Sequence, residues 1–165
     1  MTQTTAMEVF LTDVTEKPRH LILALDPGIT TGWAVLDAAD GTIVGTSVWG
    51  THELKETLDL LVRRIFTAGH TLEAVVEKMP PGSYGKLATK LEAVRRDVDF
   101  VIRETYELKV TMITPSEWKP SRVARTRKVP GRFDKTPLTP HQKDAIRMGR
   151  YAIDKQLQSW AGHNS

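Results

Sequence analysis

The chain contains no cysteine, and this absence removes several kinds of chemistry at once. It excludes disulfide bonds, zinc sites built from thiolates and a cysteine nucleophile. A chain without cysteine also fits a cytoplasmic protein. That is the location we expect.

The sequence also lacks a long hydrophobic run. No stretch approaches the roughly 20 apolar residues that span a bilayer, so we expect no membrane partner. Residues 1–20 lack a basic segment followed by an apolar one, so no secretory signal is expected. A chain of 165 residues can bury the core of one domain. We predict an extension over residues 1–19, one domain over 20–160 and a tail over 161–165.

The chain has a small excess of positive charge, a net +3, and the basic residues are unevenly distributed along the sequence. The segment from Lys119 to Lys135 contains one acidic residue, Asp134, and seven basic ones: Lys119, Arg122, Arg125, Arg127, Lys128, Arg132 and Lys135. It has no periodic apolar face and contains two prolines, which predicts a flexible loop over 119–138. Such a basic run is typical of a segment that binds a polyanion.

The stretch Leu21–Gly32, with the sequence LILALDPGITTG, organises the chain. Five apolar residues followed by Pro27 and Gly28 predict a strand buried on both faces that ends at Asp26. We interpret the glycines of this stretch as places where the backbone turns. Two interpretations of Asp26 remain open at this point: the side chain caps its own turn, or it binds a metal ion.

The rest of the pattern predicts an α/β fold in the order β-β-β-α-β-α-β-α. We predict strands at 20–26, 32–37, 42–49, 72–77 and 110–114, helices at 53–68, 86–106 and 140–160, and a helical turn at 115–118. The first three strands form an antiparallel meander, because Asp40-Gly41 is a hairpin signal. The fourth strand ends on Glu77, so a second strand also delivers a carboxylate at its carboxyl end.

The final helix begins with a clear N-terminal signal. Thr139 is a candidate N-cap, Pro140 follows it, and Gln142 completes a capping box. His141 and Asp144 share the face that must pack on the sheet, where a polar pair is unusual unless it binds something. The basic residues of this helix are expected on its other faces: Lys143, Arg147, Arg150 and Lys155.

Three segments resemble the RuvC family of Holliday junction resolvases, which have the RNase H-like fold. They are LALDPGITTGWAVLD at 23–37, VVEKMP at 75–80 and HQKDAIRMGRYAI at 141–153. The resemblance in topology covers about residues 20–157, and it implies a five-stranded mixed sheet flanked by helices. It also implies a Mg²⁺-dependent endonuclease that nicks four-way DNA junctions symmetrically as a homodimer.

By this resemblance, Asp26, Glu77, His141 and Asp144 are the catalytic and metal-binding residues for two Mg²⁺ ions. Carboxylates and water suit magnesium, and an imidazole ligand suits manganese better, so we expect Mn²⁺ to substitute. His141 either binds metal or transfers a proton of the attacking water, and the sequence leaves both roles open.

Contacts with branched DNA are expected from three regions: the loop 79–85 with Lys86, the basic segment and the start of the final helix. The resemblance implies that the loop 79–85 matches a family loop whose aromatic residue enters the junction, and Tyr84, or alternatively Met79, would have that role here. The full set of predicted nucleic-acid contacts is Tyr84, Lys86, Arg122, Arg125, Arg127, Lys128, Arg132, Lys135 and Lys143. Apolar residues of the helix 86–106 form a narrow seam, which packs either on its own sheet or in the dimer interface.

Three other functions compete with a junction nuclease. A sugar kinase or actin-like ATPase has a similar first strand, but it needs a second domain for which this chain is too short. A related nuclease acting on generic branched DNA or RNA stays open. A non-catalytic nucleic-acid-binding protein on the same fold is disfavoured by the complete set of four candidate ligands.

Overall fold

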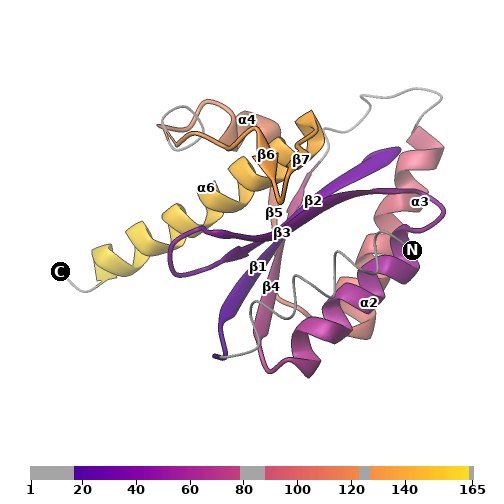
Figure 1. Ribbon diagram of the computed structural model, residues 1–165, viewed down its shortest axis with the longest axis horizontal. Coiled ribbons are helices and arrows are strands. Elements are labelled where there is room, and N and C mark those ends of the chain that lie inside the picture. Colours follow the sequence, from indigo (N-terminus) through magenta and orange to yellow (C-terminus); the bar gives the residue numbers. More distant parts are fainter. Residues whose placement is uncertain (1–16, 79–87, 123–126, 164–165) are drawn as a thin grey trace.

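The computed structural model describes residues 17–78, 88–122 and 127–163 of the chain (Figure 1). Its centre is a five-stranded sheet with the order β3-β2-β1-β4-β5. The strands are β1 (His20–Asp26), β2 (Thr30–Asp37), β3 (Ile43–Gly50), β4 (Thr71–Glu77) and β5 (Val110–Ile113). Every strand agrees with its predicted range to within two residues, so the predicted α/β fold is confirmed.

The sheet is mixed, and its strand directions decide where the carboxylates lie. Strands β1, β2 and β3 form the predicted antiparallel meander, while β1 runs parallel to β4 and β4 runs parallel to β5. Leu25 of β1 is paired with Val76 of β4. The next residue of each strand, Asp26 and Glu77, therefore emerges at the same edge of the sheet.

Helices cover both faces of the sheet. Helices α2 (Leu54–Thr67) and α3 (Ala88–Asp99) lie on one face, and α6 (Pro140–His163) lies on the other (Figure 1). Because side chains of a strand alternate between faces, Leu23 and Leu25 pack with α2 while Ile22 and Ala24 pack with α6. The α6 helix extends to His163, three residues beyond its predicted end.

Two glycines allow α6 to lie close to the sheet. A Cβ atom on Gly32 would lie 2.5 Å from the backbone carbon and oxygen of His141, and one on Gly149 would lie 2.6 Å from a methyl group of Leu36. The prediction that Gly32 forms a turn is wrong, because this residue lies inside β2. Its role is to admit the first turn of α6 beside Asp26, with which it is paired.

The helix predicted over 86–106 changes character along its length. Within the described residues it consists of α3 followed by the π-helical segment η2 (Phe100–Thr105). Val94, Val98 and Val101 of the predicted seam are buried in the core beneath α2. These side chains therefore pack on their own sheet and are not available to a partner subunit.

The described part of the basic segment includes regular structure that the sequence did not predict. The helical turn α4 (Pro115–Trp118) comes just before the segment, and a short hairpin, β6 (Arg132–Phe133) and β7 (Thr136–Pro137), lies at its end. The two residues of the hairpin turn, Asp134 and Lys135, both have positive φ angles. Such angles occur in two-residue hairpin turns, where Asn-Gly is the usual sequence.

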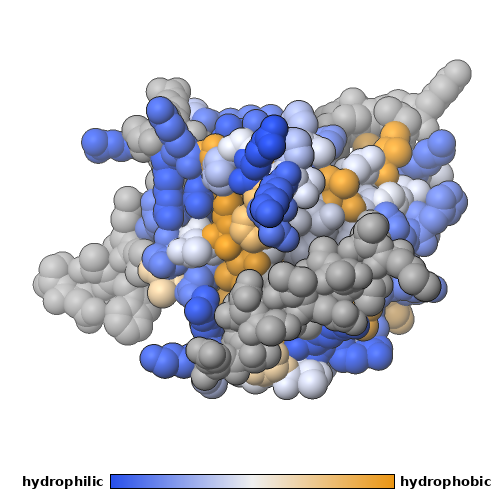
Figure 2. All heavy atoms as spheres, viewed as in Figure 1, coloured by the Kyte–Doolittle hydropathy of each residue, from blue (hydrophilic) through white to orange (hydrophobic). Residues whose placement is uncertain are grey.

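Figure 2 shows hydrophilic side chains surrounding small hydrophobic areas on the face in view. Among the described residues, no helix combines the length and the apolar character needed to cross a bilayer.

Candidate active site

Two carboxylates are buried where neighbouring parallel strands end. Asp26 follows the apolar core of β1 and Glu77 follows that of β4, and each residue is only 8% exposed. Burying a carboxylate costs free energy unless a cation or hydrogen-bond donors compensate it. The partners of these two side chains therefore indicate what the site can do.

His141 is the hydrogen-bonding partner of Asp26. Its Nδ1 atom lies 3.1 Å from Oδ2 of Asp26, and more than half of its side chain is exposed. The predicted capping box holds the turn that carries it: the Thr139 N–H donates to Oε1 of Gln142 at 2.9 Å, and the Gln142 N–H donates to Oγ1 of Thr139 at 3.3 Å. The Asp26 carboxylate thus faces α6, 115 residues away in the chain.

Asp144 lies one helical turn after His141 and is partly exposed. Within the described residues its ion pair is with Arg147, at 3.6 Å. Its charge nevertheless acts on both buried carboxylates, because it raises the pKa of Asp26 and that of Glu77. The structure therefore brings the four predicted residues to one end of the sheet.

The pKa values of the carboxylates reflect burial together with mutual repulsion. Burial raises the pKa of Asp26, and the hydrogen bond from His141 opposes that rise. Burial also raises the pKa of Glu77 to about 7, and the charge of Asp26 adds to the effect. Like charges held close together without a cation favour a shared proton, so this cluster attracts positive charge.

The structure adds two residues that sequence reasoning did not assign to the site. Nε1 of Trp118 donates a hydrogen bond to Oε2 of Glu77 at 3.2 Å, and Trp118 is itself buried. The Lys119 ammonium lowers the pKa of both Asp26 and Glu77. No sequence pattern marks Trp118 or Lys119 for this role. The two residues come near the carboxylates because α4 follows β5, and β5 packs beside β4.

The predicted nucleic-acid contacts have different surroundings. Arg122, Lys128, Arg132 and Lys135 are exposed, whereas Lys143 is half-buried. Tyr84, Lys86 and Arg125 lie outside the described residues.

Two arginines hold the basic segment against the turn between β2 and β3. The Arg127 guanidinium donates to the backbone carbonyl of Asp40. Arg150 was expected on an outer face of α6, and this prediction is wrong. Its side chain is buried and donates to the carbonyl oxygens of Gly41, at 3.1 Å, and Lys128, at 3.4 Å.

The donor set fits hard divalent cations. Asp26, Glu77 and Asp144 offer carboxylate oxygens, which magnesium prefers, and His141 offers one imidazole nitrogen. Burial and the charge of Asp26 raise the pKa of Glu77, and a bound cation would oppose both effects. Within the described ranges, however, no three acidic or histidine side chains converge closely enough to enclose an ion as they stand. Such a ligand set would have to draw together around the metal.

Comparisons with known proteins identify the fold. No protein-family profile matches the chain, and no curated protein sequence is significantly similar to it. The chain is similar to the structure of Thermus thermophilus RuvC in complex with a Holliday junction substrate, with a TM-score of 0.65 and 15% identity over 84% of this chain and 96% of that one. A second T. thermophilus RuvC structure matches over the same shares, with a TM-score of 0.62 and 14% identity. The RuvC-like, RNase H-like fold expected from the sequence is confirmed.

Proposed function

We propose that the chain is a metal-dependent endonuclease that cuts four-way DNA junctions by symmetric nicking. The observation that carries this proposal is the pair of buried carboxylates at the ends of two parallel strands, faced by His141 and Asp144 from α6. The RuvC-like fold supports it, since one of the similar structures contains a Holliday junction substrate.

Asp26, Glu77 and Asp144, with His141, would hold two Mg²⁺ ions, and Mn²⁺ would replace them. When bound, such ions supply a hydroxide nucleophile near neutral pH and neutralise charge on the scissile phosphate. Asp26 is the best candidate for a shared ligand, because the central strand β1 fixes its backbone between β2 and β4.

His141 and Lys119 have complementary tasks in this proposal. His141 is anchored through Nδ1 to Asp26 and is half exposed, so its other ring nitrogen can either bind metal or accept a proton from the attacking water. Lys119, whose charge acts on both buried carboxylates, would attract a phosphate oxygen of the approaching strand. Trp118 would keep Glu77 in position through its indole hydrogen bond.

The proposed partner is branched DNA, bound by a homodimer. A four-way junction presents two equivalent strands, and an isologous dimer offers two equivalent sites for them. The exposed cations Arg122, Arg132 and Lys135 would contact backbone phosphates, which carry no sequence information. A DNA substrate of this kind places the protein in the cytoplasm of a bacterial or phage-infected bacterial cell.

Cleavage of end-labelled four-way junctions and of linear duplexes, with Mg²⁺ and with Mn²⁺, tests the proposal. The wild type should cut junctions in pairs of symmetric nicks and leave duplexes intact. Asp26→Asn should bind junctions but not cut them, which would exclude a purely binding protein. Equal cutting of duplex, or wild-type rates in Asp26→Asn, would refute the proposed function.

A further inference from the structure

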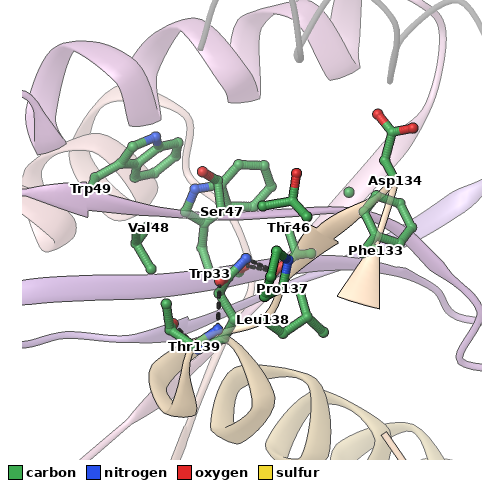
Figure 3. A pocket seen from close by; sticks show the side chains of 13 residues that line it. Trp33, Thr46, Ser47, Val48, Trp49, Phe133, Asp134, Pro137, Leu138 and Thr139 are labelled. Carbon is green, nitrogen blue, oxygen red and sulfur yellow. Dashed lines mark hydrogen bonds between the residues drawn. The ribbon is translucent and has the colours of Figure 1, made fainter. Parts of the chain in front are cut away.

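Hydrogen bonds connect the last helix, α6, to both edges of the sheet. At its start, Nε2 of Gln142 donates to Oγ1 of Thr46 on β3 at 3.2 Å, beside a pocket of about 270 Å³ (Figure 3). Farther along, two side chains of α6 bond to α4, the helical turn that follows the other edge strand, β5. The proposed cleavage chemistry gives this second connection no task so far.

The second connection converges on one carboxylate, that of Glu117. Its Oε2 atom accepts a hydrogen bond from the Tyr151 hydroxyl at 3.0 Å and another from Nζ of Lys155 at 3.2 Å. The bond to Glu117 raises the pKa of Lys155, while burial and then the same carboxylate raise the pKa of Tyr151. Both groups therefore keep their protons at neutral pH and remain donors to Glu117.

The helical turn that carries Glu117 is very short, since α4 has only four residues. Helix formation becomes favourable only once a costly first turn is complete, so such a turn has little stability of its own. Its position must be fixed by contacts of its side chains. Trp118 supplies one of these by packing in the core, and Glu117 supplies another by bonding to α6.

The two residues that follow Glu117 act on the buried carboxylates. Nε1 of Trp118 donates to Oε2 of Glu77 at 3.2 Å. The charge of Lys119 lowers the pKa of Glu77 and that of Asp26. Because Glu117, Trp118 and Lys119 are consecutive, a displacement of α4 moves all three together. The bond between α4 and α6 therefore affects where an indole and an ammonium group lie in the candidate active site.

We infer that Glu117 is a positioning residue for the cleavage reaction, because it fixes α4 to α6 and thereby holds Trp118 and Lys119 at the buried carboxylates. The inference rests on the proposed function for the reaction itself. Glu117 acts through its two neighbours and contacts neither substrate nor metal in this role. Its bond also joins the two halves of the candidate ligand set, one on the strands and one on α6.

The indole N–H signal of Trp118 tests the position of α4 without any cleavage. It is followed by NMR in ¹⁵N-labelled protein in EDTA. Glu117→Ala should shift this signal, because the indole would move away from the carboxylate of Glu77. An exposed ion pair contributes little to folding stability, so the variant should stay folded. The indole signals of Trp33 and Trp49, in the core on the other face of the sheet, are internal controls and should not move.

Four further variants separate the position of α4 from general stability. Tyr151→Phe and Lys155→Met each remove one donor, so each should give a smaller shift of the indole signal in the same direction. Glu117→Gln keeps an acceptor oxygen but loses the charge, and it should restore part of the wild-type signal position. Glu92→Ala, a matched change at an exposed glutamate of α3, should behave as the wild type.

Cleavage of four-way junctions provides the second arm. Glu117→Ala should bind junctions as the wild type does but cut them roughly tenfold to a hundredfold more slowly at saturating enzyme, as expected when reacting groups are displaced by about 1 Å. Glu117→Gln should regain part of the rate, and Glu92→Ala should keep all of it. The rates are compared well below the melting temperature of each variant.

A lower melting temperature in Glu117→Ala with an unchanged Trp118 signal would show a purely stabilising contact and overturn the inference. An equal effect in Glu92→Ala would also overturn it, as would a shifted signal with an unchanged saturated cleavage rate. A wild-type protein that cuts no junction would refute the proposed function, whereas a shifted Trp118 signal in Glu117→Ala would still show that Glu117 positions α4.

Discussion

Burial and the repulsion of neighbouring carboxylates both raise the pKa of Glu77, and this makes the stability of the protein depend on pH. Its pKa is raised from 4.5 to about 7, chiefly by burial and then by the charge of Asp26. Between these two pH values the folded protein holds a proton that the unfolded chain has already released. The stabilising contribution of this proton is complete below about pH 4.5 and is lost as the pH rises through 7.

We therefore expect the metal-free protein to lose stability between pH 5 and pH 8, and Glu77→Gln to lose less. The amide stays neutral at every pH, so it removes the titration while keeping the shape of the side chain. Urea unfolding in EDTA at several pH values measures the difference between the two proteins. Glu56→Gln, at an exposed position on α2, is the control and should follow the wild type. Identical pH dependence in wild type and Glu77→Gln would contradict the prediction.

Single residues were predictable where the chain itself marks them. Asp26 and Glu77 stand out because each terminates an apolar run, and His141 and Asp144 because they are polar residues at the start of a capped helix, on the face expected to pack on the sheet. Trp118 and Lys119 carry no such mark. They approach the carboxylates because β5 lies beside β4 in the sheet, and that is a property of tertiary packing.

At the scale of elements, the close approach of α6 to β2 depends on Gly32, which has no side chain. A Cβ atom on Gly32 would collide with the backbone of His141, which cannot move away as a flexible side chain can. Gly32→Ala should therefore displace the first turn of α6 and separate His141 from Asp26.

We expect Gly32→Ala to cost about 1–3 kcal/mol of unfolding free energy, the usual range for overpacking, and to reduce cleavage strongly. Gly131→Ala is the matched control, since nothing lies within 4 Å of a Cβ atom there. Urea unfolding and junction cleavage are measured for both variants. The role given to Gly32 would be wrong if the two variants behaved alike.

The basic segment divides into an anchored part and an exposed part. Arg127 is bonded to the Asp40 carbonyl, whereas Arg132 and Lys135 project from the exposed hairpin. Arg132→Ala with Lys135→Ala should weaken junction binding, and each lost phosphate contact should lower the salt slope by roughly 0.9. Cleavage at saturating enzyme should change little.

The Arg127→Ala variant should differ in stability from the Arg132→Ala/Lys135→Ala double variant, because it also removes a contact that holds the basic segment to the β2–β3 turn. We expect a lower melting temperature in Arg127→Ala and an unchanged one in the double variant. Salt-dependent binding and thermal unfolding together distinguish the two parts. A saturated cleavage rate that collapses while binding is unchanged would assign the hairpin to catalysis instead.

The helices and strands differ in how well the sequence predicts them. The five strands were predictable because apolar runs and turn residues delimit them. The β6–β7 hairpin was not, since Phe133 is its only large apolar residue and its turn is Asp-Lys where Asn-Gly is the usual signal. Likewise, the π-helical end of α3 has the same residue pattern as an ordinary helix.

At the scale of the whole molecule, the proposed dimer needs a surface other than the seam of α3. Val94, Val98 and Val101 are covered by the protein's own core, whereas Phe100 at the end of this helix is 45% exposed. Single exposed apolar side chains are common on protein surfaces, so Phe100 serves only as the position at which a dimer contact through this face is tested.

We expect a dimeric mass in solution, and Phe100→Glu should shift it toward the monomer by placing a charge in an apolar contact. Sedimentation equilibrium measures the mass, and junction cleavage is followed in parallel. Arg103→Glu, an exposed charge change on the same turn, is the control. A wild-type monomer that makes paired nicks at full rate would exclude the dimer.

The order of the elements along the chain also decides when the molecule can act. Asp26 and Glu77 belong to strands that leave the ribosome early, while His141 and Asp144 belong to α6, which follows all five strands. A nascent chain that ends before α6 carries two carboxylates, half of its candidate ligand set and an uncovered apolar sheet face. If the proposed activity holds, synthesis itself would delay it until the last helix docks, and a prematurely terminated chain would lack cleavage activity and be prone to aggregate.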